Sequence, residues 1–176
     1  ALSADEKYLY FSSNMPGTKG ASDLFKVEIN ADGSFGTPIN LGDEINTEAR
    51  ETFPFIAKDD VLYFASDGHL GLGGLDVFAS KINAEGINGK PVNIGSPINS
   101  NMDDFGYIID TQSKIGFFTS NRTGGEGFDD IYKFKEIIKL QIENIESVVG
   151  VIMDEETNEV IPNTEVVIFN DKMEEV

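Results

Sequence analysis

A seventeen-residue motif occurs three times along this chain at almost even spacing. It reads LYFSSNMPGTKGASDLF at 9–25, LYFASDGHLGLGGLDVF at 62–78 and GFFTSNRTGGEGFDDIY at 116–132. Its aromatic positions Phe11, Phe64 and Phe118 are 53 and 54 residues apart. A period of this length indicates a repeat architecture. Because a repeated unit is more often scaffold than catalytic machinery, the repeat also disfavours an enzyme.

Each repeat can be read as four short strands separated by turns. The second repeat predicts strands at 52–57, 61–66, 76–82 and 90–94. Aromatic and β-branched residues fill these segments, and Gly, Asn and Asp lie between them. Short strands bounded by such turn residues are typical of an antiparallel sheet.

A second motif recurs where the fourth strand is expected. This proline–asparagine motif reads GTPINLGDEIN at 36–46 and GKPVNIGSPIN at 89–99, again 53 residues apart. Pro38 and Pro91 have no N–H to donate, so we expect the fourth strand at the edge of its sheet. Two acidic residues, Glu51 and Asp104, then share one repeat position just before the next first strand.

Four antiparallel strands per repeat are typical of a β-propeller blade. The sequence therefore predicts an all-β fold with about 2.5 four-stranded blades over residues 1–136: strands two to four of one blade, a complete second blade, and strands one to three of a third. Propellers close with roughly four to eight blades. We therefore expect a piece of a longer protein, with further blades upstream or on another chain. Its open sheet edges are expected to pair with other chains.

Composition excludes several classes of function. The net charge of −18 disfavours nucleic acid and anionic lipid as partners, because both require a basic surface. The absence of cysteine excludes thiol catalysis, thiolate metal sites and disulfides. No apolar run reaches the roughly 18 residues expected of a membrane-spanning segment.

The C-terminal part differs from the repeats. Residues 143–176 carry ten acids and one base, which is half of the net charge. Residues 137–147 lack Gly and Pro and read as an extended connector. Residues 148–176 contain an apolar segment, an acidic turn, Ile161-Pro162 and a second apolar segment, which predicts a hairpin. Since an isolated hairpin is marginally stable in water, we expect it to need support from elsewhere.

These motifs resemble a known family. The long motif, with S-[ND] after one strand and D-[LIV]-[FY] opening the next, resembles the WD40-like repeat of bacterial propellers related to TolB. Together with the proline–asparagine motif, it is similar to the variant in OmpA-family envelope proteins of Bacteroidetes. Residues 148–176 resemble the start of a carboxypeptidase-regulatory-like β-sandwich, except that Asn163-Thr164 replaces the usual small residues.

The resemblance implies a non-catalytic scaffold that binds other proteins in the periplasm, associated with the outer membrane. Envelope proteins are the expected partners, since some family members serve type IX secretion or gliding. Peptidoglycan would be bound through domains outside these residues. Two alternatives stay open: a propeller that binds carbohydrate or peptidoglycan fragments, and the propeller gate of a hydrolase, which would require an α/β-hydrolase segment.

The sequence contains no convincing catalytic set. His69 is the only histidine, and no G-x-S-x-G motif supplies a nucleophile for it. We expect His69 to be a surface loop residue. Asp67, His69, Arg122 and Glu126, all in loops after the second strands, are the candidates for contacts with a partner, although a solvated loop position is the simpler reading of Arg122.

Calcium is the one cofactor considered, and no other is expected. Asp76, Asp129 and Asp130 lie in or beside glycine-rich loops, where carboxylates and carbonyls could hold Ca²⁺. No twelve-residue calcium loop is present. The simpler reading is that Asp23, Asp76 and Asp130, at one repeat position, each accept backbone N–H bonds from their own loop. The repeated aromatic residues are expected in the core between blades: Tyr8, Tyr10, Phe11, Tyr63, Phe64, Phe117 and Phe118.

Overall fold

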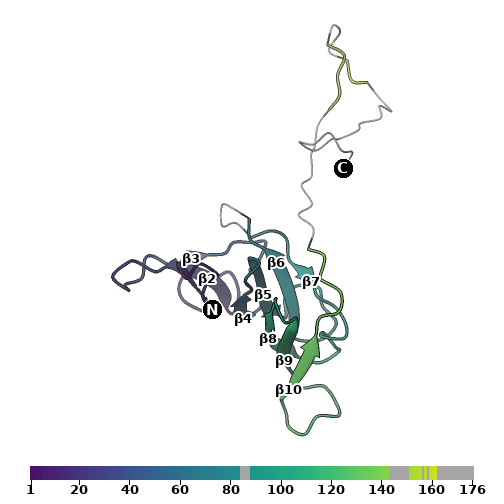
Figure 1. Cartoon of the computed structure of the whole chain (residues 1–176). Coiled ribbons are helices and arrows are strands. Elements are labelled where there is room, and N and C mark those ends of the chain that lie inside the picture. Colours follow the sequence, from purple (N-terminus) through teal and green to yellow (C-terminus); the bar gives the residue numbers. More distant parts are fainter. Residues whose placement is uncertain (84–87, 143–150, 156, 158, 162–176) are drawn as a thin grey trace. The chain divides into compact units, whose positions relative to one another are not determined.

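The computed structural model describes residues 1–83, 88–142, 151–155, 157 and 159–161 (Figure 1). The chain divides into two compact units, Ala1–Asn144 and Ile145–Val176. The described residues contain ten strands and no helix, so the prediction of an all-β chain is confirmed. Accordingly, none of these residues belongs to a helix that is long and apolar enough to cross a membrane.

The strands form three antiparallel sheets within the first unit, labelled in Figure 1. Sheet 1 contains β1 (Tyr8–Ser13), β2 (Asp23–Glu28) and β3 (Ile39–Asn40). Sheet 2 contains β4 (Glu51–Ile56), β5 (Val61–Ser66), β6 (Asp76–Lys81) and β7 (Val92–Asn93). Sheet 3 contains β8 (Asp104–Asp110), β9 (Ile115–Ser120) and β10 (Asp130–Lys135). Within each sheet the strands lie in chain order, and none of the three sheets closes on itself.

The numbers of strands, three, four and three, are those that the repeat predicts. The proline-preceded strands β3 and β7 lie at sheet edges, as expected. The fourth strand is shorter than predicted, because β7 pairs with β6 only through Phe78↔Asn93 and Ala79↔Val92. Pro91 has no N–H for the ladder, and Gly95 adopts a φ of 71° that turns the chain away.

Unusual backbone conformations recur with the repeat. Both β4 and β8 contain an irregularity in register at the same repeat position, and there Phe53 and Gly106 have φ values of 50° and 63°. Glu6, Asp60 and Lys114, in the turn before each second strand, have φ values of 59°, 59° and 58°. Since left-handed conformations are uncommon for non-glycine residues, this recurrence indicates that turn geometry is part of the repeated unit.

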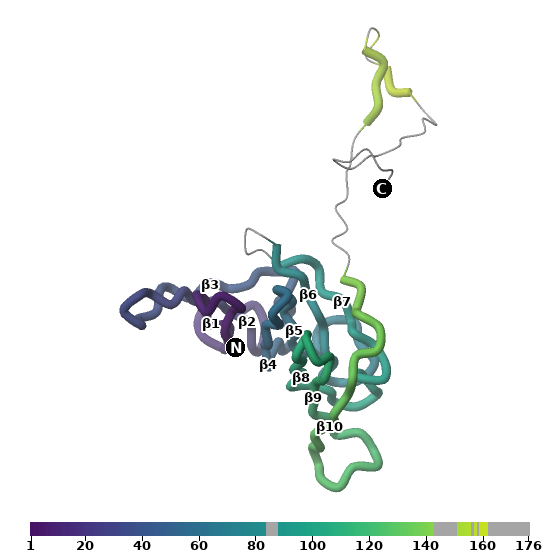
Figure 2. The backbone as a smooth tube through the Cα atoms, viewed as in Figure 1, coloured from purple at the N-terminus to yellow at the C-terminus, as the bar shows by residue number. Residues whose placement is uncertain are grey.

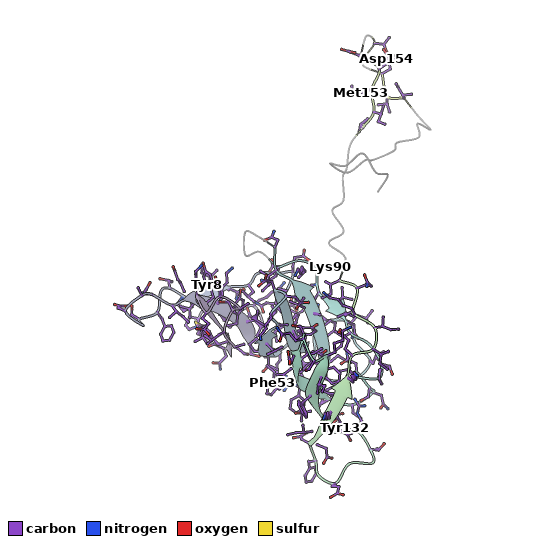
Figure 3. All side chains as sticks on the ribbon, viewed as in Figure 1. Tyr8, Phe53, Lys90, Tyr132, Met153 and Asp154 are labelled. Atoms are coloured by element: carbon purple, nitrogen blue, oxygen red, sulfur yellow. The ribbon has the colours of Figure 1, made fainter. Side chains whose placement is uncertain are left out.

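The core lies in two layers, one on each side of sheet 2. Strand β5 is buried throughout, and its side chains alternate between the layers, as a strand requires. The layer toward sheet 1 contains Tyr10, Leu24, Ile45, Ile56, Leu62, Phe64 and Phe78. The layer toward sheet 3 contains Ala57, Val61, Tyr63, Val77, Ala79, Tyr107, Ile109 and Phe118. Figure 2 traces the backbone, and Figure 3 shows the side chains that fill these layers.

The predicted aromatic core is confirmed at four of its seven positions. Tyr10, Tyr63, Phe64 and Phe118 are buried. The ring centroids of Tyr63 and Tyr107 lie 4.6 Å apart, which joins β5 to β8 across the layer. Tyr8 and Phe11 are only half-buried. The prediction is wrong for Phe117, which is exposed because it projects from the face of sheet 3 that no described residue covers.

In the second unit, where Met153 and Asp154 are labelled in Figure 3, the described residues pair before Ile161-Pro162, whereas the second apolar segment of the predicted hairpin follows Pro162 and lies outside the described residues. Met153 and Val160 form an antiparallel bridge, and the Asp154 N–H donates to the Glu159 carbonyl at 2.9 Å. The other residues of the predicted 148–176 sandwich segment lie outside the described residues. Of the predicted connector, residues 137–142 are described, and they form neither helix nor strand.

Candidate interaction surface

The loop after each second strand is closed by an aspartate. Asp23 accepts hydrogen bonds from the N–H groups of Lys19 and Gly20 at 2.8 and 3.1 Å. In the second repeat, Asp76 accepts from the N–H groups of Leu72 and Gly73, both at 2.9 Å. Asp130 accepts from the Gly127 N–H at 3.2 Å in the third. The reading of these aspartates as loop caps is therefore confirmed.

The calcium candidates are not gathered into one site. Asp76 lies in sheet 2, whereas Asp129 and Asp130 lie at the start of β10 in sheet 3. Among the described residues, no three His, Asp or Glu side chains come together in a group that could hold a metal ion. One buried carboxylate oxygen of Asp76 has no hydrogen-bond partner, and neither has the buried amide nitrogen of Asn93. Their counterparts Asp23 and Asn40 bond to each other at 2.6 Å in the first repeat.

In the first two repeats this loop also binds the segment that begins the next sheet. The Leu75 N–H donates to Asp103 Oδ1 at 2.9 Å, and the Asp104 N–H donates to the Leu75 carbonyl at 2.6 Å. Gly73 packs so closely that a Cβ there would lie 2.1 Å from the Met102 carbonyl oxygen. Because glycine has no Cβ, this approach of two backbones is possible only at that residue type.

A buried carboxylate lies at the centre of each junction between sheets. Glu51, at the start of β4, accepts hydrogen bonds from the Thr47 N–H at 2.8 Å, the Thr47 hydroxyl at 2.7 Å and the Ser66 hydroxyl at 2.7 Å. Asp104 occupies the same position in sheet 3 and accepts from the N–H and hydroxyl of Ser100 at 2.6 and 2.8 Å. Both carboxylates are fully buried.

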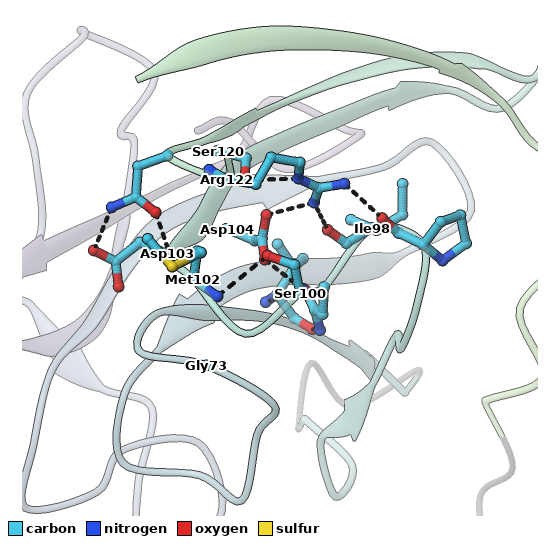
Figure 4. Close-up of polar contacts among 12 residues, drawn as sticks. Gly73, Ile98, Ser100, Met102, Asp103, Asp104, Ser120 and Arg122 are labelled. Carbon is cyan, nitrogen blue, oxygen red and sulfur yellow. Dashed lines mark hydrogen bonds and ion pairs between the residues drawn. The ribbon is translucent and has the colours of Figure 1, made fainter. Parts of the chain in front are cut away.

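Arg122 completes the second of these junctions (Figure 4). Its guanidinium lies 2.6 Å from Asp104 and donates to the carbonyls of Pro97 and Ile98 at 3.0 and 2.5 Å. It also lies over the ring of Phe118, 4.9 Å from the centroid. Only 23% of its side chain is exposed. The expectation of a solvated loop residue is therefore wrong, because the shorter Asp104 leaves room for the guanidinium to turn inward.

The candidate Asp67 forms a two-point contact with Arg50. Asp67 Oδ1 accepts from the Arg50 N–H at 2.8 Å, and Oδ2 lies 2.8 and 2.7 Å from two guanidinium nitrogens. Burial would raise the pKa of Asp67, but the hydrogen bonds and charge of Arg50 outweigh it and hold that pKa below its ordinary value. The same repeat positions in sheet 3 hold Asp103 and Asn121, which bond through 2.8 and 3.1 Å contacts without an ion pair.

His69 is not the surface loop residue that the sequence predicts. Its ring packs against Phe78 and Phe64, with centroids 5.1 and 5.9 Å apart. Its Nε2 lies 2.9 Å from the Ile45 carbonyl oxygen, which can only accept, so this nitrogen carries the proton. The ring thus closes one end of the core layer between sheets 1 and 2.

Glu126 is the candidate that the structure leaves fully open. Every residue from Thr123 to Asp129 is exposed, including Phe128 at 96%. A Cβ on Gly127 would meet no atom closer than 3.6 Å, whereas its counterpart Gly73 is enclosed by Met102. In the second repeat, the equivalent loop surface contacts the neighbouring sheet. In the third repeat, the same surface is exposed to solvent.

A cavity of about 350 Å³ lies beside β5 and β8, and its lining includes the charged side chains of Asp59, Lys114 and Glu136. Tyr63 also lines it, but its ring is buried in a stack with Tyr107. Burial, together with the negative charges of Asp59 and Glu136, raises the pKa of Tyr63. The cavity therefore offers charged groups but no free aromatic face of the kind on which a sugar ring packs.

The sequence analysis did not identify the structural role of two asparagines, Asn46 and Asn99. Both are buried, and each bonds to the backbone of the strand beside it. The available signal was the spacing of six residues between two asparagines, repeated in both copies of the proline–asparagine motif.

Comparison with known proteins adds no assignment to this geometry. No protein-family model matches the chain, and no curated protein matches it in sequence.

Proposed function

We propose that the three sheets are consecutive blades of a WD40-like β-propeller, and that this propeller is a non-catalytic scaffold that binds other proteins. One observation carries the proposal: the junction between sheets 1 and 2 recurs between sheets 2 and 3, with a buried acid and a closely packed glycine at the same repeat positions. Glu51 and Asp104 occupy its centre, and Gly20 and Gly73 make its close contacts. A junction that is used twice can continue a stack of repeats.

The buried polar groups form hydrogen bonds within the protein, which supports a scaffold rather than an active site. The buried carboxylates Asp23, Glu51, Asp76 and Asp104 all accept hydrogen bonds from neighbouring loops. His69, the single histidine, is bonded to a backbone carbonyl. Polar groups held in this way position loops rigidly, and rigid loops are suited to protein recognition.

The location rests on sequence resemblance. The two repeated motifs resemble those of OmpA-family envelope proteins of Bacteroidetes, and we therefore propose a periplasmic protein associated with the outer membrane. A secretion or motility assembly is the proposed setting, with envelope proteins as partners. The loop that carries Glu126 and Phe128 is the proposed contact region, because it is exposed throughout.

The test is affinity capture of envelope proteins from detergent-solubilised Bacteroidetes envelopes, identified by mass spectrometry. We expect a secretion, motility or peptidoglycan-linked protein that is lost with the Glu126→Lys, Phe128→Ser variant. Phe35→Ser, at another exposed aromatic in the turn between β2 and β3, is the matched control and should retain capture. Equal capture by all three proteins would contradict the proposal, and saturable binding of purified muropeptides alone would favour the carbohydrate-binding alternative.

A further inference from the structure

A side-chain amide completes the outer edge of sheet 2. Asn99 Oδ1 accepts from the Val77 N–H at 2.8 Å, and its Nδ2 donates to the Val77 carbonyl at 2.8 Å. The same Nδ2 donates to Asn93 Oδ1 at 2.8 Å, which fixes the amide relative to β7. Asn99 Oδ1 thus takes the place of a peptide carbonyl of a longer strand opposite the Val77 N–H, while the Val77 carbonyl also accepts from the Ile94 N–H at 3.2 Å.

Sheet 1 is completed in the same way. Asn46 Oδ1 accepts from the Leu24 N–H at 2.8 Å, and its Nδ2 donates to the Leu24 carbonyl at 3.0 Å and to Asn40 Oδ1 at 2.8 Å. The two asparagines of each proline–asparagine motif therefore act together. One lies on the short edge strand, and the other, six residues later, binds the backbone of the longer strand.

The corresponding edge of sheet 3 is open. The Glu136 N–H, just after β10, donates to the Lys114 carbonyl on the β9 side at 2.8 Å. Because backbone groups alternate between the two edges of a strand, the N–H and C=O of Ile131 point to the opposite edge. Ile131 is the counterpart of Leu24 and Val77. Among the described residues, no donor or acceptor reaches its outward backbone groups, and β9 is the one strand that pairs with β10.

Side-chain exposure also differs at this position, because Leu24 and Val77 lie on sheet faces that pack in the core layers, whereas Ile131 lies on the same exposed face of sheet 3 as Phe117. The side chains of Leu24 and Val77 are both 0% exposed, whereas Ile131 is 76% exposed. The described part of the following segment does not cover it, since Leu140 and Ile142 pack against the core layer between sheets 2 and 3. Among the described residues, the outward N–H and C=O of Ile131 have no partner at the sheet edge, and its side chain is exposed on the adjoining face of sheet 3.

We propose that the free edge of β10 binds an extended peptide segment of the sequence class P-[IV]-N-[IL]-G-x-x-I-N, supplied by a partner polypeptide. By analogy with the pairing of β6 and β7, its first asparagine would lie opposite Tyr132 and the residue before it opposite Lys133. Its second asparagine would bond to the N–H and C=O of Ile131. This inference rests on the proposed protein-binding function and names the chemistry of one partner.

Lys133 is compatible with such a partner strand. Lysine on an edge strand often opposes unwanted pairing. Lys26 occupies the same repeat position in β2, however, and is paired there with Ile39 of β3. The proline of the motif lies beside the last paired residue, where a missing N–H is tolerated, so a segment of this class can end its pairing after two residues.

The test is titration of the full chain with a fluorescent peptide of the sequence of residues 89–99, followed by anisotropy and by amide NMR. We expect saturable binding, with slowed hydrogen exchange at the Ile131 and Lys133 amides and no change at Val77. A peptide with Asn99→Leu should bind at least tenfold more weakly, because its side chain cannot bond to the Ile131 backbone. Equal binding of the two peptides would overturn the inference.

The chain variant Ile131→Pro removes the outward N–H and leaves the β9 ladder intact, so it should lose binding, whereas Ile131→Val should keep it. If Ile131→Pro does not fold, the exchange rates of the unsubstituted chain decide the question. Protection of the Val77 amide instead of the Ile131 amide would indicate that the peptide displaces the chain's own motif. A dimer that persists in the presence of the peptide would indicate that a second copy of the chain occupies this edge. Either result would contradict the proposal. Failure of the peptide to bind would overturn this inference but not the proposed function, which envelope capture by the loop of Glu126 and Phe128 tests separately.

Discussion

Glu51 and Asp104 occupy equivalent positions in the repeat, but different side chains stabilise their buried carboxylates. Glu51 reaches the Ser66 hydroxyl directly and is held by hydrogen bonds alone. Asp104 is one methylene shorter, and Arg122 lies between it and Ser120, the counterpart of Ser66. The residue that matches Arg122 at the first junction is Gly68, where a Cβ would lie 1.9 Å from Thr47 Oγ1.

The two junctions therefore share one role, which is to hold a buried carboxylate between two sheets, although the side chains around the carboxylate differ. A buried carboxylate requires hydrogen bonds or an opposite charge: the first junction supplies hydrogen bonds alone, and the second supplies hydrogen bonds from Ser100 together with the charge of Arg122. The length of the acid and the size of the residue after S-[ND] must change together. Glutamate therefore accompanies glycine, and aspartate accompanies arginine.

The largest effect is expected from Arg122→Met, which removes the charge that balances Asp104. Loss of one member of a largely buried ion pair should lower the free energy of unfolding by about 3 kcal/mol. Urea denaturation followed by circular dichroism would measure it. The pair Asp104→Glu, Arg122→Gly recreates the first junction and should be more stable than Arg122→Gly alone. A double variant no more stable than the single one would show that the two solutions are not interchangeable.

Gly73→Ala compares a covered loop with an open one. The added Cβ would meet the Met102 carbonyl, so the loop must shift, and we expect a loss of about 2 kcal/mol in the free energy of unfolding. Gly127→Ala is the matched control, since its Cβ would meet no atom closer than 3.6 Å. Parallel urea titrations should separate the two variants. A similar loss in both would mean that the contact with Met102 does not limit stability.

Glu51→Gln tests whether the first junction depends on a pure acceptor. The amide keeps the size of the side chain but turns one group into a donor that faces the donors of Thr47 or Ser66. One buried donor would lose its partner, at a cost of about 1.5 kcal/mol. The midpoint of urea unfolding at pH 7 is the measurement. Glu126→Gln, the same substitution at an exposed position, is the control, and a loss no greater than its own would contradict the account.

The smallest effect is expected from Arg50→Met, because the Arg50 side chain is 55% exposed and Asp67 keeps its hydrogen bond from the backbone N–H of residue 50. The free energy of unfolding at pH 7 should fall by about 0.5 kcal/mol. NMR titration of the Asp67 carboxyl carbon should show its pKa rising toward the ordinary value. Since a depressed pKa contributes stability above the unfolded value, near 4, and loses it as the pH falls, the variant should lose less stability between pH 5 and pH 2. An unchanged pKa would show that Arg50 is not its cause.

The strands could be predicted because their signals are local. Alternating apolar residues between turn residues predicted β5 and β6 to within a residue, and the prolines predicted that β3 and β7 are edge strands. The fourth strand was predicted too long because its end depends on Gly95 and Asn99, whose roles appear only when β7 is placed beside β6.

The candidate residues were harder to predict because their contacts are distant in sequence. His69 binds the carbonyl of Ile45, 24 residues away, and Arg122 binds those of Pro97 and Ile98, 25 and 24 residues away. Loop position alone suggested solvent exposure for both. Glu126, with no such contact, remains the one candidate for which loop position and exposure agree.

The sequence by itself determined the repeat, the strand order and the positions of the buried acids, since these follow from side-chain pattern and turn chemistry within a few residues. Only the tertiary structure decided how each acid is neutralised and which edge is left open. Those outcomes depend on distances between sheets, where one methylene decides whether a serine or an arginine is within reach. The same packing covers Leu24 and Val77 but leaves Ile131 exposed.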